Sequence, residues 1–132
     1  MSQAFKTIAE IKEIVAKHLL TQNKKSALNH TNGEVETCIY HHENGCKCAV
    51  GILITTECYD PVIEDVGVLD IAPGNNPAEL APRHTKLINT LLCSDIYVLD
   101  PDVWSVLAKA QQIHDNYEPA DWYQQLSIAK WI

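Results

Sequence analysis

The stretch EVETCIYHHENGCKCAVGILI, residues 34–54, decides how the middle of this chain folds. Two runs of strand-favouring residues flank Asn44-Gly45, and this dipeptide is the strongest short signal for a two-residue hairpin turn, because such a turn needs positive φ at both positions. In that register His41 faces Cys48 on one side of the hairpin. The run after Cys48, AVGILI, fits either a continued strand or a short helix.

Four segments outside this stretch have the apolar spacing and capping residues of helices. The first repeats apolar side chains every three or four positions and has Ser2 as its N-cap, and the third opens at Asp100-Pro101. The expected helices are residues 3–22, 82–93, 101–116 and a last one from Pro119.

The interval between residues 55 and 82 is irregular. It holds four prolines and two glycines, which predicts short turns, with VGVLDIA (66–72) as its one candidate strand. The whole sequence therefore predicts an α+β fold, in which about four helices pack with a small antiparallel β-hairpin. A length of 132 residues with 46% hydrophobic residues indicates a single compact domain, 1–132, with enough apolar surface for its own core.

Charge and hydropathy exclude several classes of protein. Seventeen acidic residues against ten basic ones give a net charge of −7, and Arg83 is the only arginine. Nucleic-acid binding draws most of its affinity from clustered Lys and Arg, so it is not expected. No apolar run reaches the roughly 18 residues of a membrane span, and the N-terminus lacks a signal peptide's layout. We therefore expect a cytoplasmic protein that contacts neither nucleic acid nor membrane.

The chain has five cysteines, an odd number, and no secretion signal; both observations argue against a disulfide framework. We interpret Cys58 and Cys93 as small buried apolar side chains.

A structural zinc ion is one hypothesis for the histidines and cysteines of the hairpin, because such sites take four Cys or His ligands. Its fourth ligand would come from Glu43, His84 or His114. The favoured interpretation has no cofactor and lets the cysteines pack. The candidate zinc ligands of the hairpin are Cys38, His41, His42, Cys46 and Cys48.

A cysteine nucleophile is a second hypothesis. Cys48 precedes a small-residue run that could open a helix, and a helix N-terminus lowers the pKa of a thiol. The enzyme would also need a histidine base and an orienting carboxylate. His114-Asp115 offers both types, but adjacent helical residues point about 100° apart, so we expect no relay between these two.

An anion site is a third hypothesis, in the segment APGNNPAELAPRHTK, residues 72–86. Backbone N–H groups at a helix start, together with Arg83, His84 and Lys86, could hold a phosphate or carboxylate. Tyr40 or Trp104 would then contact the flat part of such a ligand.

Three pieces of the chain also carry a resemblance. They are AKHLLTQNKKSA (16–27), the pattern CxY…NGxKCAVGxLI…YDP (38–61), and Gln111-x-x-His114-Asp115 followed by Trp122. This combination resembles a family of small proteins of bacteria and their phages that has no agreed activity. The chain departs from that pattern at Ile52, where cysteine is expected, and at Thr55, where proline is expected.

The resemblance implies a phage setting and a protein that acts on a host molecule. We therefore expect a non-catalytic binding protein that captures a host protein, or sequesters a small anionic, nucleotide-like signalling molecule, to counter host defence. The alternatives are a Cys48-dependent enzyme and a zinc-stabilised interaction module. A homo-oligomer is compatible with each. The residues expected to bind the ligand are Arg83, His84, Lys86, Tyr40, Trp104, Gln111 and His114.

Overall fold

The computed structural model describes residues 5–23, 27–28, 37–41, 45–71 and 82–132. Four α-helices form most of this part: α1 (Ile8–Gln22), α2 (Pro82–Cys93), α3 (Pro101–Asn116) and α4 (Pro119–Ile128). The remaining regular elements are three 3₁₀ helices, η1 (Gly51–Leu53), η2 (Pro61–Asp65) and η3 (Val68–Ile71), and two short strands, β1 (Ala27–Leu28) and β2 (Thr37–Cys38).

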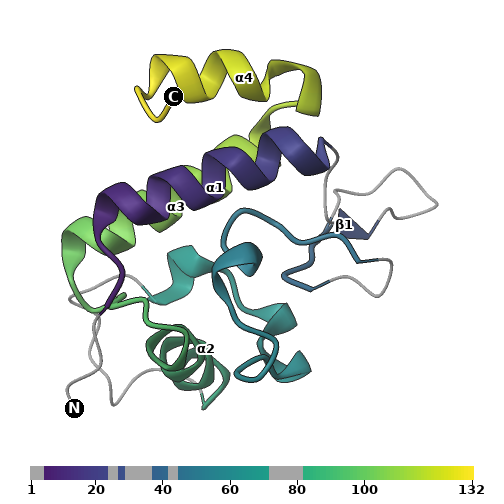
Figure 1. The fold of residues 1–132 in the computed structure, drawn as a ribbon. Coiled ribbons are helices and arrows are strands. Elements are labelled where there is room, and N and C mark those ends of the chain that lie inside the picture. Colours follow the sequence, from purple (N-terminus) through teal and green to yellow (C-terminus); the bar gives the residue numbers. More distant parts are fainter. Residues whose placement is uncertain (1–4, 24–26, 29–36, 42–44, 72–81) are drawn as a thin grey trace.

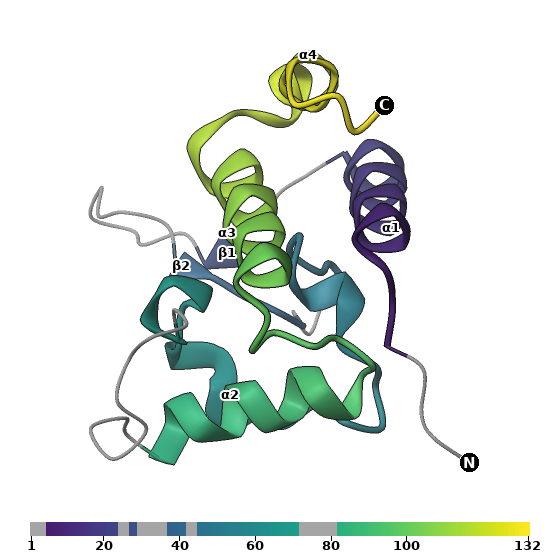
Figure 2. The same ribbon diagram turned by 90° about the vertical axis from the view of Figure 1, so that its left-hand side faces the viewer.

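The helices are arranged in layers within a single domain. In Figures 1 and 2, α1 and α3 lie side by side, α4 covers one side of this pair, and α2 lies on the opposite side. Helix α4 packs against both α1 and α3, whereas α2 packs against η2 and η3. None of the described helices is long and apolar enough to span a membrane.

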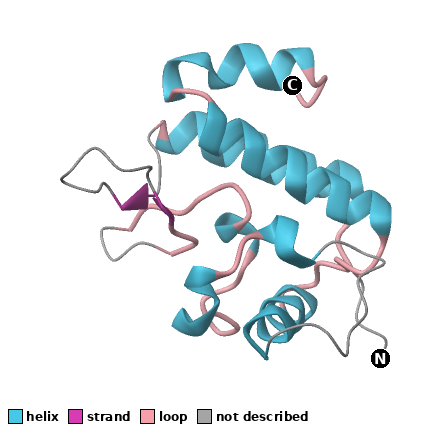
Figure 3. Cartoon of the chain, turned by 180° about the vertical axis from the view of Figure 1, so that it is seen from behind, coloured by secondary structure: helices cyan, strands magenta, loops and turns pink. Residues whose placement is uncertain are grey.

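The α+β prediction is correct about the four helices, but it overestimates the amount of β-structure. Figure 3 shows a mainly α-helical chain. In the described residues the only ladder joins β1 and β2, which pair antiparallel over two residues each, with Ala27 opposite Cys38. The candidate strand at residues 66–72 is also wrong, because Val68–Ile71 forms η3.

The hairpin register differs from the predicted one by a single residue. His41 forms an isolated antiparallel bridge with Lys47, not with Cys48; Gly45 has φ of 91°, and Asn44 lies outside the described residues. A shift of one residue exchanges the two faces of a strand. It places Cys46 and Cys48 in the core and leaves His41 to stack on Tyr59 with a ring-centroid distance of 4.3 Å, so burial of the two thiols explains the difference.

Capping residues set the ends of the long helices. The prediction for Asp100 is confirmed, since its Oδ1 accepts from the N–H of Asp102 at 2.8 Å. Helix α1 begins later than predicted: Thr7 Oγ1 accepts from the N–H of Glu10, and the Glu10 carboxylate accepts from the N–H of Thr7. This reciprocal pair is a capping box, and it also lowers the pKa of Glu10. Ser2 lies outside the described residues.

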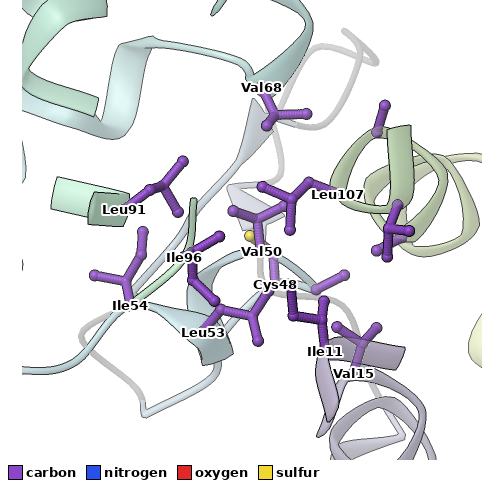
Figure 4. Packing of buried hydrophobic residues seen from close by; sticks show 14 of the residues in the cluster. Ile11, Val15, Cys48, Val50, Leu53, Ile54, Val68, Leu91, Ile96 and Leu107 are labelled. Carbon is purple, nitrogen blue, oxygen red and sulfur yellow. The ribbon is translucent and has the colours of Figure 1, made fainter. Parts of the chain in front are cut away.

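The core surrounds the segment 46–54. Figure 4 shows Cys48, Val50 and Leu53 between side chains of α1, α3 and the α2 region. Every one of these core residues has under 10% of its surface exposed. The helices contribute Ile11, Val15 and Leu19 from α1, Leu87 and Leu91 from α2, Leu107 and Ile113 from α3, and Trp122 and Leu126 from α4.

Two cysteines contradict the interpretation as buried apolar side chains. Cys58 and Cys93 form a disulfide with a Cα–Cα distance of 6.0 Å, and Cys93 is exposed. The same two segments are also joined by a hydrogen bond, in which Oγ of Ser94, the residue after α2, accepts from the N–H of Thr55 at 3.1 Å. Spatial proximity of this kind is not visible in cysteine spacing alone.

Gly51 is required by a close approach of two backbone segments. A Cβ atom at this position would lie 2.0 Å from the carbonyl oxygen of Tyr40, far inside van der Waals contact. Both residues are buried, so neither segment can move outward without opening the core.

We predict that Gly51→Ala lowers the free energy of unfolding by about 3 kcal/mol or more, because overpacking forces a backbone shift in a buried region. The matched control is Gly67→Ala, since an added Cβ there meets only the Asp70 carboxylate at 3.4 Å. Urea denaturation followed by circular dichroism measures both variants. Equal losses in the two would contradict the assigned contact.

Candidate functional site

The segment 46–48 is fixed to α1 by side chains that bind its backbone. Gln22 binds Lys47 twice: its Oε1 accepts from the N–H of Lys47 at 2.9 Å, and its Nε2 donates to the Lys47 carbonyl at 3.0 Å. His18 Nε2 donates to the same carbonyl at 2.7 Å. Sequence reasoning missed this role, because it depends on contacts more than 20 positions apart.

The same segment is joined to α3 by Gln111. The Oε1 atom of Gln111 accepts from the N–H of Val50 at 3.4 Å, and its Nε2 donates to Asp115 Oδ1 at 2.9 Å. The Gln111-x-x-His114-Asp115 pattern and the CAVG segment, 61 positions apart along the chain, therefore meet in the fold.

His114 and Asp115 do form a pair, which corrects the expectation that they could not. His114 Nδ1 lies 2.7 Å from Asp115 Oδ1. The Cβ atoms of adjacent helical residues diverge, but Nδ1 lies close to the backbone, so a short carboxylate can reach it. His114 is 1% exposed, and its ring stacks on Trp122. It is thus held as a core residue at the end of α3.

Cys48 is enclosed in the core. Its side chain has no exposed surface, and its Sγ accepts from the N–H of Gly51 at 3.4 Å. The η1 helix that follows has only three residues. A thiol without exposed surface cannot meet a substrate in this conformation, so the geometry gives no support to a Cys48 nucleophile.

The zinc hypothesis finds no cluster in the described part of the chain, where no three His, Cys, Asp or Glu side chains come together as a metal site would need. His41 Nε2 donates to the carbonyls of Gly51 and Ile54, at 2.9 and 3.1 Å. His42, Glu43 and the side chain of Cys38 lie outside the described residues.

Glu64 is a hub that sequence reasoning missed. Its carboxylate accepts from the backbone N–H groups of Tyr40 at 2.8 Å and His41 at 3.2 Å, and also from the Tyr59 hydroxyl. Burial of Tyr59, followed by its bond to Glu64, raises the pKa of that phenol well above its usual range. The hydroxyl of Tyr40 donates to the carbonyl of Val66, so Tyr40 acts in the core.

A groove of about 380 Å³ lies between η3 and the C-terminal half of α3. Val68 and Ala108 are its buried apolar part. Trp104 fixes η3 to α3, because its Nε1 donates to the carbonyl of Val68 at 2.9 Å. The residues lining this groove are Gly67, Val68, Asp70, Ala108, Gln111, Gln112, Asp115 and Asn116.

The predicted binding residues thus separate into three places. Gln111 lines the groove, with His114 and Trp104 bonded to residues of its wall. Tyr40 is in the core. Arg83, His84 and Lys86 lie on the first turns of α2 and are not among the described lining residues.

On α2, Lys86 pairs with Asp60 at 3.7 Å, and both side chains are nearly half exposed. His84 Nδ1 is buried, and it has no hydrogen-bond partner within the described part of the chain. Residues 72–81, the rest of the expected anion loop, lie outside the described residues. The N-terminal end of α2 therefore carries basic side chains, but the described residues do not form a pocket around them.

We predict that Glu64→Gln lowers the free energy of unfolding by about 2 kcal/mol, because hydrogen bonds to a charged acceptor are worth roughly 1.5–3 kcal/mol. It should also move the pKa of Tyr59 back towards its usual value, measured by ultraviolet titration. Glu57→Gln removes the same charge from an exposed turn and serves as the control. If Tyr59 titrates identically in all three proteins, the assigned hydrogen bond between Tyr59 and Glu64 is contradicted.

We predict that acid weakens the fold partly through His18. Burial is the main cause that lowers the pKa of His18 below 6.5; the hydrogen bond to the Lys47 carbonyl opposes it, and electrostatic repulsion from His114 and Lys47 acts with it. The unfolded chain therefore binds the proton more readily, so this stabilisation is complete above pH 6.5 and is lost as pH falls below it. Urea denaturation at pH 7.5 and 5.5 should show a smaller loss for His18→Gln than for the wild type. Parallel losses would contradict the prediction.

Comparisons with known proteins leave the function to be argued from this geometry. No protein-family model, curated protein or solved structure matches the chain.

Proposed function

We propose that the protein is a non-catalytic binding protein whose ligand occupies the groove between η3 and α3. The observation that carries the proposal is the lining of this groove, which combines two carboxylates and three amides with the buried apolar side chains of Val68 and Ala108. Ligand sites in proteins typically combine apolar surface with a few placed polar groups in a volume of about 300–1,000 Å³.

The use of the reactive side chains supports a binding role over a catalytic one. Cys48 is enclosed, and His18 and His41 bind backbone carbonyls. Groups that satisfy buried backbone atoms cannot also transfer protons without loosening the core. The groove itself, as described, contains neither a thiol nor an imidazole among its lining side chains.

The chemistry of the groove indicates the kind of ligand. Asp70 and Asp115 are acidic, and the amides of Gln112 and Asn116 can accept as well as donate. A ligand with several N–H donors on an apolar body, such as a guanidinium or amine compound, complements this lining.

The wider biological proposal is that the ligand or partner belongs to a host. Capture of a host protein, or sequestration of a host signalling molecule in the cytoplasm to counter defence, rests on the resemblance to small phage and bacterial proteins. A nucleotide-like anion would have to use Arg83, His84 and Lys86 on α2, so the sign of the ligand's charge separates two locations.

Titration of labelled protein with agmatine, an amine with a guanidinium group, tests the groove by amide chemical shifts. We expect shifts at residues 67–70 and 108–116, and a stabilisation of about 2.7 kcal/mol once agmatine reaches a hundredfold excess over Kd. Gln112→Ala and Asn116→Ala should weaken binding, because both exposed side chains line the groove.

The matched control is Gln124→Ala, an exposed glutamine on α4, which should leave binding unchanged. Absence of shifts with agmatine, or shifts that survive both groove substitutions, would overturn the proposal. A parallel titration with adenosine monophosphate that shifts residues 82–86 would favour the anion site on α2 instead.

A further inference from the structure

Among the cysteines whose side chains the structure describes, Cys58 and Cys93 of the disulfide are the ones with appreciable solvent-exposed surface. Cys93 is exposed and Cys58 is half-buried, whereas Cys46 and Cys48 are free thiols buried in the core. A reductant that attacks a disulfide needs access to one sulfur along the bond. Cys93, the last residue of α2, offers that access.

The bond joins α2 to the turn that follows η1, across 35 positions of sequence. Figure 2 shows α2 on the far side of the domain from α4. Two further interactions join α2 and the residue after it to residues 55–60: the hydrogen bond from Thr55 to Ser94 and the exposed ion pair of Lys86 with Asp60. An exposed ion pair contributes little, so the disulfide is the strongest of these links.

Helix α2 also has an anchor that does not depend on sulfur. Leu87 and Leu91 have no exposed surface, and they face the core. These side chains keep the middle of α2 packed against the core when the disulfide at its C-terminal end is reduced. The fold therefore has a covalent link at one end of a helix that is otherwise held by its own apolar face.

We propose that the Cys58–Cys93 disulfide is a reversible redox clamp on the C-terminal end of α2. When it is closed, α2 is fixed to the turn at residues 55–60. When a dithiol reduces it, this end of α2 and the turn become mobile while α1, α3 and α4 stay packed. The clamp acts whether or not the groove holds a ligand.

The chemistry is thiol–disulfide exchange with a dithiol reductant. One thiolate of the reductant attacks Sγ of Cys93, a mixed disulfide forms, and the Cys58 sulfur leaves as a thiolate and takes a proton. The second thiol of the reductant then attacks the mixed disulfide and releases Cys93. Two electrons pass to the protein, both cysteines end as thiols, and the reductant ends as a disulfide.

Hydrogen exchange with mass-spectrometric readout, with and without dithiothreitol in native buffer, tests the clamp. We expect amides of residues 92–95 and 55–60 to exchange at least about tenfold faster after reduction, while α1, α3 and α4 change much less. Alkylation after native reduction should label Cys58 and Cys93 and leave the buried Cys46 and Cys48 unlabelled. Removal of the reductant in air should restore slow exchange.

The double variant Cys58→Ser, Cys93→Ser is the matched control. It should exchange like the reduced protein and should not respond to dithiothreitol. Three results would each overturn the proposal: alkylation of both cysteines before any reductant is added, reduction only in the presence of denaturant, or equal acceleration in all four helices. The last result would describe a staple for the whole fold rather than a local clamp.

Discussion

The structure depends on hydrogen bonding to an irregular backbone segment at its centre. Residues 46–54 form no long helix and no continuous strand, yet most of them are buried. A buried N–H or carbonyl without a partner costs about as much as a lost hydrogen bond. The fold meets this constraint by taking partners from neighbouring elements: Gln22 and His18 from α1, Gln111 from α3, and His41 from the preceding segment.

This constraint explains why residues that the sequence suggested for catalysis or binding instead hold the backbone in the fold. Histidine and glutamine have long polar side chains, so each can form a hydrogen bond with a backbone group of a neighbouring segment. A catalytic histidine and a histidine that holds a carbonyl look alike in sequence. His18, His41 and Gln111 share the second role, and Gly51 adds the close contact with Tyr40 that lets the two backbone segments approach. The pattern around residues 38–54 is therefore best understood as a requirement of packing.

The sequence predicts those features that depend on neighbours along the chain. The bounds 82–93 for α2, the start of α3 after Asp100 and the opening of α4 at Pro119 follow from apolar spacing, capping and proline geometry. The hairpin register failed by one residue, because it was decided by which side chains the core accepts. Glu64 and the disulfide were missed for a similar reason. Each joins positions more than 20 residues apart, and no local pattern records that they meet.

Only one of the described lining residues of the candidate site was predicted from the sequence to bind a ligand. Gln111 was chosen from the sequence and does line the groove, whereas Asp70, Gln112 and Asn116 had no signal beyond being polar. The basic residues Arg83, His84 and Lys86 were grouped because they are close in sequence. They lie on α2, whereas the groove lies between η3 and α3. The net charge of −7 and the two carboxylates of the groove act in the same direction, because both attract cations and repel anions over distances near the Debye length of about 8–10 Å. An anionic ligand would therefore have to overcome the field of the whole molecule, and a cationic ligand would be drawn to the groove by it.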